Sequence, residues 1–312
     1  MIITLTPNPS VDRTLHVPQL RFNEVLRAHD VRVDWGGKGF NVSRALRILN
    51  EETLALAWVG GGTGRMVQHG LNQLGIKTDF VWVEEETRIN TVAQEDSGEW
   101  YIRLNEPGPH IPEDAIQSLL AKAEAYASKK DIWVAAGSLP QDVPADFYTQ
   151  LIHLLKNKGV RVFFDANGEA LRAGLSDPPF LVNPDISETE DFVGFSIHNY
   201  DDAKRAVLPF LRLGVEYVAL SIDGLGLLLA SQQEMMLATP PKVSIRNVTG
   251  AGDALMAGMA YGFARGMDLR EIARLGAAFS AVAVTTVSLA SVKNSDVEAM
   301  LPRVEVRTVN VM

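Results

Sequence analysis

The chain has 312 residues, of which 46% are hydrophobic and 21% are charged, and this is the composition of an ordinary globular protein with a sizeable core. Its formal net charge of -9 argues against nucleic acid or an anionic membrane surface as the main partner, because both need a basic face. The sequence contains no cysteine, which excludes disulfides, thiolate metal sites and cysteine nucleophiles.

Apolar runs of strand length alternate with segments of helical period along the chain. They are IITL before residues 41–50, LALAWV before 64–74, DIWVAAG before 145–158, and then VRVFFDA and EYVALS. This alternation predicts an α/β fold with a mainly parallel sheet covered by helices. The start of the chain lacks the pattern of a signal peptide, so we expect a cytoplasmic protein. The apolar stretch 277–290 is shorter than a membrane span and predicts a buried core helix.

Two regions, residues 12–34 and 80–104, interrupt this alternation. They contain the short runs HVPQL, VRVDW, FVWVE, NTVAQ and WYIRL, with little helical period between them. Such runs can pair into a small separate sheet that acts as a lid. No linker or repeat divides the chain, so we expect one domain over residues 1–312 with two insertions.

The strongest chemical signal is NVTGAGDALMAGM, residues 247–259, where a turn of small residues leads into a segment of helical period. Glycines allow backbone N–H groups to converge on an anion, and the start of a helix adds unpaired donors and a positive dipole end. Gly250, Ala251 and Gly252 therefore form a candidate anion hole, and Asp253 is a candidate base beside it. The same segment is also typical of an Asp that caps a helix after a glycine turn.

A second glycine cluster, DWGGKGFNVSRAL, residues 34–46, also runs into an amphipathic segment and includes Lys38. It suits a polar sugar phosphate lying against the backbone, or simply an exposed loop and helix start. The sequence has no GxxxxGK[ST] segment, and GLGLLL at 224–229 lacks the third glycine of a dinucleotide fingerprint. Gly258, Gly262 and Gly266 follow at four-residue spacing and predict close helix packing.

Together the two clusters resemble the signatures of the PfkB-type carbohydrate kinases, in the same order and at similar separation. Further matches are PSVD at 9–12, TRIN at 87–90, NEPGP at 105–109, GSLP at 137–140 and FDANGEAL at 164–171. They span nearly the whole chain. The lysine of GGKG and the TRIN and NEPGP segments are most similar to the 1-phosphofructokinase and tagatose 6-phosphate kinase branches of the family.

The resemblance implies a ribokinase-like three-layer α/β sandwich with a small β-sheet lid, and it allows roles to be carried over at matching positions. It implies that Asp253 is the catalytic base. It implies that the sugar hydroxyls are held by Asp12, Gly37, Lys38 and Asn41. It implies that the substrate phosphate is bound by Arg27, Lys38, Arg88 and Arg103, with Asn90 and Ser138 assisting. These candidate substrate-binding residues are Asp12, Arg27, Gly37, Lys38, Asn41, Arg88, Asn90, Arg103 and Ser138.

The nucleotide half departs from the family pattern. Asn183-Pro-Asp185 stands where Lys-Pro-Asn is usual, and Asp223 stands between Ser221 and Gly226 in the segment that usually lies near the ATP phosphates. The exchange would weaken ATP binding by charge repulsion unless Mg²⁺ or a shifted loop compensates. Glu188 remains and could orient Mg²⁺ through water. The candidate nucleotide-binding residues are Asn183, Asp185, Glu188, Ser221, Asp223, Gly224, Gly226, Thr249 and Ala290.

We therefore expect an ATP- and Mg²⁺-dependent kinase that converts fructose 1-phosphate to fructose 1,6-bisphosphate. Tagatose 6-phosphate and fructose 6-phosphate are alternative substrates. A protein of another class, a weakly catalytic sugar-phosphate-binding protein, is the second alternative, because the nucleotide motifs are altered. Exposed lid strands often pair with a partner sheet, so we also expect a homodimer through the lids.

Overall fold

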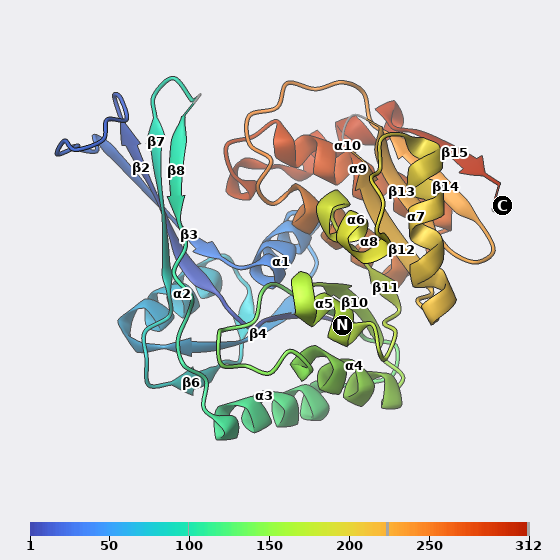
Figure 1. The fold of residues 1–312 in the computed structure, drawn as a ribbon, viewed down its shortest axis with the longest axis horizontal. Helices are drawn as coiled ribbons and strands as arrows, with labels where there is room; N and C mark the ends of the chain where they lie inside the picture. The colour runs from blue at the N-terminus through green and yellow to red at the C-terminus, as the bar shows by residue number, and fades with distance from the viewer. Residues whose placement is uncertain (99, 223–224, 311–312) are drawn as a thin grey trace.

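The computed structural model describes residues 1–98, 100–222 and 225–310. Its large sheet has the strand order β15-β14-β13-β12-β11-β10-β9-β1-β4-β5, and β6 pairs with the end of β4 (Figure 1). Strands β1, β4, β5, β6 and β9 to β12 pair in parallel, whereas β13, β14 and β15 extend the sheet as antiparallel strands. The predicted mainly parallel α/β fold is confirmed.

The strands of the large sheet are β1 Ile2–Thr6, β4 Thr53–Gly60, β5 Lys77–Thr78, β6 Val81–Val83, β9 Ile132–Ala136, β10 Arg161–Asp165, β11 Leu181–Val182, β12 Tyr217–Ile222, β13 Gly226–Ala230, β14 Met235–Thr239 and β15 Glu305–Val309. The helices are α1 Lys38–Ile48, α2 Gly61–Gln73, α3 Glu113–Tyr126, α4 Phe147–Asn157, α5 Gly168–Gly174, α6 Ile186–Val193, α7 Tyr200–Leu213, α8 Ala251–Arg265, α9 Leu269–Val284 and α10 Asn294–Met300, with short 3-10 helices at Leu289–Ser291 and Leu301–Arg303.

Helices cover both faces of the large sheet, because its strands are apolar on both sides. In β1, Ile3 and Leu5 pack into a core with α3, α4, α5 and α7, whereas Ile2 belongs to a core with α1, α8, α9 and α10. A smaller core around Phe40 and Val67 lies beside α2. This is the three-layer arrangement that the sequence predicts.

The lid is a separate sheet of four strands in the order β3-β2-β7-β8, standing beside the large sheet (Figure 1). Its strands are β2 Ser10–Val17, β3 Asp30–Gly36, β7 Ile89–Glu95 and β8 Tyr101–Leu104. The predicted run FVWVE is an exception, because its residues Val81–Val83 pair with β4 of the large sheet and not with the lid. Val81 is buried there, in the same core as Leu56 of β4.

The apolar stretch 277–290 is only partly helical, because α9 ends at Val284. Thr285 and Thr286 turn their hydroxyls back onto carbonyls of the last turn, which satisfies those acceptors and ends the helix. No helix among residues 1–98, 100–222 and 225–310 is long and apolar enough to cross a membrane.

The glycines of α8 serve two purposes. A Cβ atom on Gly258 would lie 3.1 Å from Cα of Gly276, and one on Gly262 would lie 2.8 Å from Cγ1 of Ile272, so both allow α8 to pack closely on α9. Gly266 does not share this role. It follows the end of α8 with a φ of 68°, and a Cβ there would meet no neighbour, so it is a helix C-cap.

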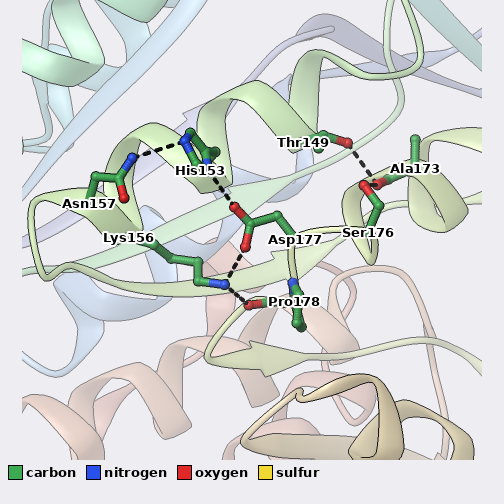
Figure 2. A network of polar contacts seen from close by, with 8 residues as sticks. All are labelled: Thr149, His153, Lys156, Asn157, Ala173, Ser176, Asp177 and Pro178. Atoms are coloured by element: carbon green, nitrogen blue, oxygen red, sulfur yellow. Dashed lines mark hydrogen bonds and ion pairs between the residues drawn. The ribbon is translucent and has the colours of Figure 1, made fainter.

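A surface network joins α4 to the segment after α5 (Figure 2). Nδ1 of His153 lies 2.9 Å from Oδ2 of Asp177, Lys156 pairs with the other oxygen of Asp177, and Thr149 donates to the carbonyl of Ala173 at 2.7 Å. These contacts hold the outer helices together.

Candidate active site

The carboxyl ends of the central parallel strands open into a cavity of about 390 Å³. Thr6 ends β1, Gly137 follows β9, Asp165 ends β10 and Asn183 follows β11, and all four line it. In an open α/β sheet this edge is where ligands bind, because loops of several strands converge there. A second cavity of about 520 Å³ lies under the lid and shares Asp12, Asn41, Asn90, Thr249 and Gly250 with the first.

The N-terminus of α8 faces the first cavity. Gly250 precedes the helix with a φ of 84°, a conformation that favours glycine, and no side chain caps the helix. A Cβ on Gly252 would meet no atom within 4 Å, so a ligand can approach this backbone closely. Gly250 and Gly252 line the cavity, and Ala251 lies between them. The first-turn N–H groups have no intrahelical acceptor and can therefore stabilise an anion.

Asp253 lies in the first turn of α8 and is buried at the edge of the cavity. Nδ2 of Asn41 donates a 2.8 Å hydrogen bond to its Oδ2. Burial, followed by the nearby carboxylate of Asp165, raises the pKa of Asp253 to about 7, although Asn41 and Lys38 oppose this rise. A carboxyl group with such a pKa can accept a proton near neutral pH.

Lys38 and Asp165 form an ion pair on the floor of the same cavity. Nζ of Lys38 lies 2.5 Å from Oδ1 of Asp165, which is almost completely buried. Burial by itself would lower the pKa of Lys38, but Asp165, Asp253 and Glu188 raise it above its usual value. Lys38 is therefore a cation at any physiological pH, and its remaining donors can reach a ligand.

The lid brings a set of short polar side chains to the cavity. Oγ of Ser10 donates to Oδ1 of Asp12 at 2.6 Å, and Nδ2 of Asn90 lies 3.0 Å from both of these oxygens. β2 pairs with β7, and Asp12 lies opposite Asn90 in that pairing, which explains the contact. The second oxygen of Asp12 can accept a hydrogen bond from a sugar hydroxyl.

Arg88 and Ser138 also line the first cavity. Nη2 of Arg88 donates to the carbonyl of Asn8 at 2.8 Å and Nη1 to that of Glu106 at 3.0 Å. These bonds fix the guanidinium at the cavity wall, where it can bind an anion. Burial lowers the pKa of Arg88, although the group remains charged at neutral pH.

The two other predicted arginines lie elsewhere. Arg103 lines the cavity under the lid, with Nη2 3.3 Å from Oγ1 of Thr249. Arg27 lies in the exposed segment between β2 and β3 and lines neither cavity. The structure therefore gathers Asp12, Gly37, Lys38, Asn41, Arg88, Asn90 and Ser138 at one cavity but leaves Arg27 apart from it.

The altered nucleotide motif has a local structural explanation. Asp185 is the N-cap of α6: its Oδ1 accepts from the N–H of Glu188 at 2.7 Å, and Oε2 of Glu188 accepts from the N–H of Asp185 at 2.8 Å. This capping box directs the Asp185 carboxylate to its own helix. Burial raises the pKa of Glu188 to about 7. Oδ1 of Asn183 is buried without a hydrogen-bond donor among the described residues.

Of the remaining nucleotide candidates that the structure describes, Thr249 lines both cavities, whereas Ser221, Gly226 and Ala290 line neither. Ser221 pairs in register with Leu227, and Gly226 allows the β13 backbone to pass close to Ala238, where a Cβ would lie 2.2 Å from the carbonyl oxygen. Ala290 is exposed in the 3-10 helix after α9. Asp223 and Gly224 lie outside the described residues.

Sequence reasoning did not assign a role to Asp165, Asn167, Asn8 or Ser10, although all four line the cavity. Asp165 and Asn167 could have been found, because they follow the buried run VRVFF at the carboxyl end of a predicted parallel strand. The capping box was also visible, since Asp185-Ile-Ser-Glu188 has the spacing of that motif.

A three-layer sandwich with a β lid, an uncapped helix N-terminus and a carboxylate beside it suit a kinase that transfers a phosphoryl group to a hydroxyl of a small molecule. The pfkB family carbohydrate kinase profile matches residues 7–295, and the chain belongs to this family. It is a carbohydrate kinase that uses ATP.

Curated relatives cover almost the whole chain. The 1-phosphofructokinase of Bacillus subtilis strain 168 is 32% identical over 307 residues, 98% of this chain and 99% of its own. The 1-phosphofructokinase of Vibrio cholerae is 30% identical over 288 residues, covering 92% and 90%. Phosphofructokinase-2 of Escherichia coli, solved in complex with potassium, superposes with a TM-score of 0.91 at 28% identity, covering 96% and 98% of the two chains.

Proposed function

We propose that this kinase phosphorylates fructose 1-phosphate at its C6 hydroxyl, with Asp253 as the general base. The observation that carries the proposal is the position of the buried Asp253 between the N-terminus of α8 and a cavity lined by Lys38, Arg88 and short polar side chains. The two curated relatives named 1-phosphofructokinase support this substrate.

In the proposed reaction the C6 hydroxyl gives its proton to Asp253 while its oxygen forms a bond to the γ-phosphorus of ATP. The bond from that phosphorus to the β–γ bridging oxygen breaks, which releases ADP. Within the predicted anion hole Gly250–Gly252, the N–H of Ala251 donates to the carbonyl of Val248 at 3.3 Å, so the N–H groups of Gly252 and the adjoining Asp253 would bind the charge that develops on the transferred group. Arg88 and Ser138 bind the phosphate already on C1, and Asp12 and Asn90 orient the sugar hydroxyls.

The residues near α6 fit a hydrated Mg²⁺. Glu188 and Asn183 both line the cavity, and Oδ1 of Asn183 accepts no hydrogen bond from the described residues. Carboxylate and amide oxygens are the ligands that Mg²⁺ and its bound waters prefer. Bound Mg²⁺ would neutralise phosphate charge on the nucleotide. It would also lower the raised pKa of Glu188.

ADP release measured with fructose 1-phosphate, tagatose 6-phosphate and fructose 6-phosphate, each with several nucleotides, tests this function. We expect the highest kcat/KM with fructose 1-phosphate and ATP. A higher value with one of the other sugars would contradict the substrate, and no ADP release with any sugar would favour a weakly catalytic sugar-phosphate-binding protein.

Fructose 6-phosphate is a second candidate substrate. The phosphofructokinase-2 of Escherichia coli in complex with fructose-6-phosphate superposes on this chain with a TM-score of 0.89. In this case the 6-phosphate of the sugar would bind at Arg88, and the sugar would lie in the reverse direction, so that its C1 hydroxyl faces Asp253.

We also propose that two chains associate through the outer faces of their lids. The strand register places Asp12, Thr14 and Arg32 toward the cavity and therefore turns Leu15, Val31, Val33 and Leu104 to the other side. Val31 is 47% and Leu104 64% exposed, so most of the face is apolar and uncovered within one chain, although the exposed Arg13, opposite Val33, also lies on it.

A second copy is the occupant that this lid face suits, because a two-fold axis brings identical apolar faces together. Val33→Glu should convert a dimer to a monomer in sedimentation velocity, because it puts a charge into the apolar face. Leu213→Glu, on an exposed helix end, is the control. A monomeric wild type would contradict the proposal.

A further inference from the structure

Arg44 lies on α1 one turn after Asn41 and is 8% exposed. Its Nη2 donates to Oδ1 of Asp34 on β3 at 2.9 Å, and its Nη1 lies 3.4 Å from Oδ1 of Asn41. A buried guanidinium is costly unless acceptors surround it. The two acceptors therefore fix its position above the Asn41 side chain.

The Asn41 amide has one acceptor end and one donor end, and the neighbours of the two ends differ in charge. Its Nδ2 faces the carboxylate of Asp253 at 2.8 Å, and its Oδ1 faces the guanidinium of Arg44. A flipped amide would place oxygen against the carboxylate and nitrogen against the cation. Arg44 thus selects the orientation in which Asn41 donates to Asp253.

We propose that Arg44 is a positioning residue of the phosphoryl-transfer site, which fixes the Asn41 amide toward Asp253 and is itself held by Asp34 of the lid. The inference rests on the proposed role of Asp253 as the general base.

The anchor of Arg44 belongs to the same pair of lid strands as a sugar contact. In the register of β2 and β3, Asp34 lies opposite Asp12, which lines the sugar cavity. A displacement of β3 would therefore withdraw both the acceptor of Arg44 and the acceptor for the sugar. The chain Asp34–Arg44–Asn41–Asp253 links the position of the lid to the environment of the base.

The charged groups that act on Asp253 are Asp165 at the end of β10 and Lys38 and Arg44 on α1. Arg44 and the hydrogen bond from Asn41 both favour the ionised carboxylate. Loss of Arg44 removes one charge and releases the Asn41 amide, so the pKa of Asp253 should rise. A base with a higher pKa is protonated over more of the pH range, and the acidic limb of the rate profile moves to higher pH.

The test compares Arg44→Gln with Arg47→Gln. Arg47→Gln is a matched control, because it removes a positive charge from the same helix but leaves the Arg44–Asn41 contact in place. We expect Arg44→Gln to move the acidic limb of kcat/KM upward by about one pH unit, the usual scale for a nearby charge, with about a tenfold loss at pH 6 and recovery at high pH. Arg47→Gln should leave the limb in place. A uniform loss of rate with an unmoved limb would overturn the proposal.

A double-mutant cycle with Asn41→Ala separates action through Asn41 from direct action of the Arg44 charge on Asp253. We expect Arg44→Gln to add a smaller shift once Asn41 is truncated, because only the direct effect of its charge remains, whereas an equal shift in both backgrounds would overturn the positioning role. If Arg44→Gln does not fold, Asp34→Asn should produce a smaller shift in the same direction, and an unmoved limb there counts against the proposal. Full activity of Asp253→Ala would instead reject the proposed base.

Discussion

Nζ of Lys38 donates a 2.5 Å hydrogen bond to Oδ1 of Asp165, and this bond joins the first turn of α1 to the end of β10. The pair crosses the floor of the cavity, with the carboxylate buried and the ammonium half-exposed. Each charge therefore stabilises the other where neither would be stable alone. The same carboxylate also raises the pKa of Asp253. Asp165 therefore both pairs with Lys38 and changes the protonation of Asp253.

Replacement of Asp165 should move the pH dependence of the reaction toward acid. Asp165 raises the pKa of Asp253, so Asp165→Asn should lower it and shift the acidic limb of kcat/KM to lower pH, the opposite sign to loss of Arg44. The sugar KM should rise, because Lys38 loses its partner. The measurement is a rate profile from acid to neutral pH. Asp177→Asn, a surface carboxylate (Figure 2), is the control and should not move the limb.

Removal of the proposed base should affect the chemical step and not sugar binding. Asp253→Ala should lower kcat by a factor on the order of 10² to 10⁴, the usual range for a general base. Calorimetry should show a sugar-phosphate Kd close to that of the wild type, since Lys38 and Arg88 remain. A kcat comparable to the wild type would remove Asp253 from the mechanism.

Arg88 should act through the phosphate of the substrate. Arg88→Ala should raise the KM for fructose 1-phosphate by about 10- to 100-fold, the loss of one charge-assisted contact. The effect should shrink with unphosphorylated fructose, which serves as the internal control. Equal losses with both sugars would instead point to the carbonyls of Asn8 and Glu106, which Arg88 also binds.

The nucleotide half can be tested by reversion to the family pattern. Asn183→Lys with Asp185→Asn should lower the KM for Mg·ATP, because it adds an ammonium and removes a carboxylate near the polyphosphate. Asparagine caps a helix about as well as aspartate, so α6 should remain stable. The sugar KM should barely change. If the KM for Mg·ATP rises or stays constant at low ionic strength, then either these residues do not face ATP or the site suits another phosphoryl donor. Rates measured with several nucleotides would separate these two cases.

The sequence by itself determined the features that depend on neighbours along the chain. The alternation of apolar runs with helical segments predicted the α/β sandwich, and the short polar and apolar runs predicted the lid. The turn of small residues before Asp253 predicted that a helix starts there but left open whether Asp253 caps it, and the structure shows that no side chain does. Such features are readable because backbone conformation and hydrophobic period are local properties.

Only the tertiary structure decided which side chains meet. Asn41 and Asp253 are 212 residues apart, and Lys38 and Asp165 are 127 apart, so no local pattern specifies either contact. The first contact comes from the packing of α1 with α8 in one core. The second comes from the strand order, because β1 lies between β4 and β9 and β10 follows β9, which brings the ends of distant strands to one edge. Pairing of strands is set by the packing of whole layers, and the raised pKa of Asp253 arises from the burial that this packing imposes.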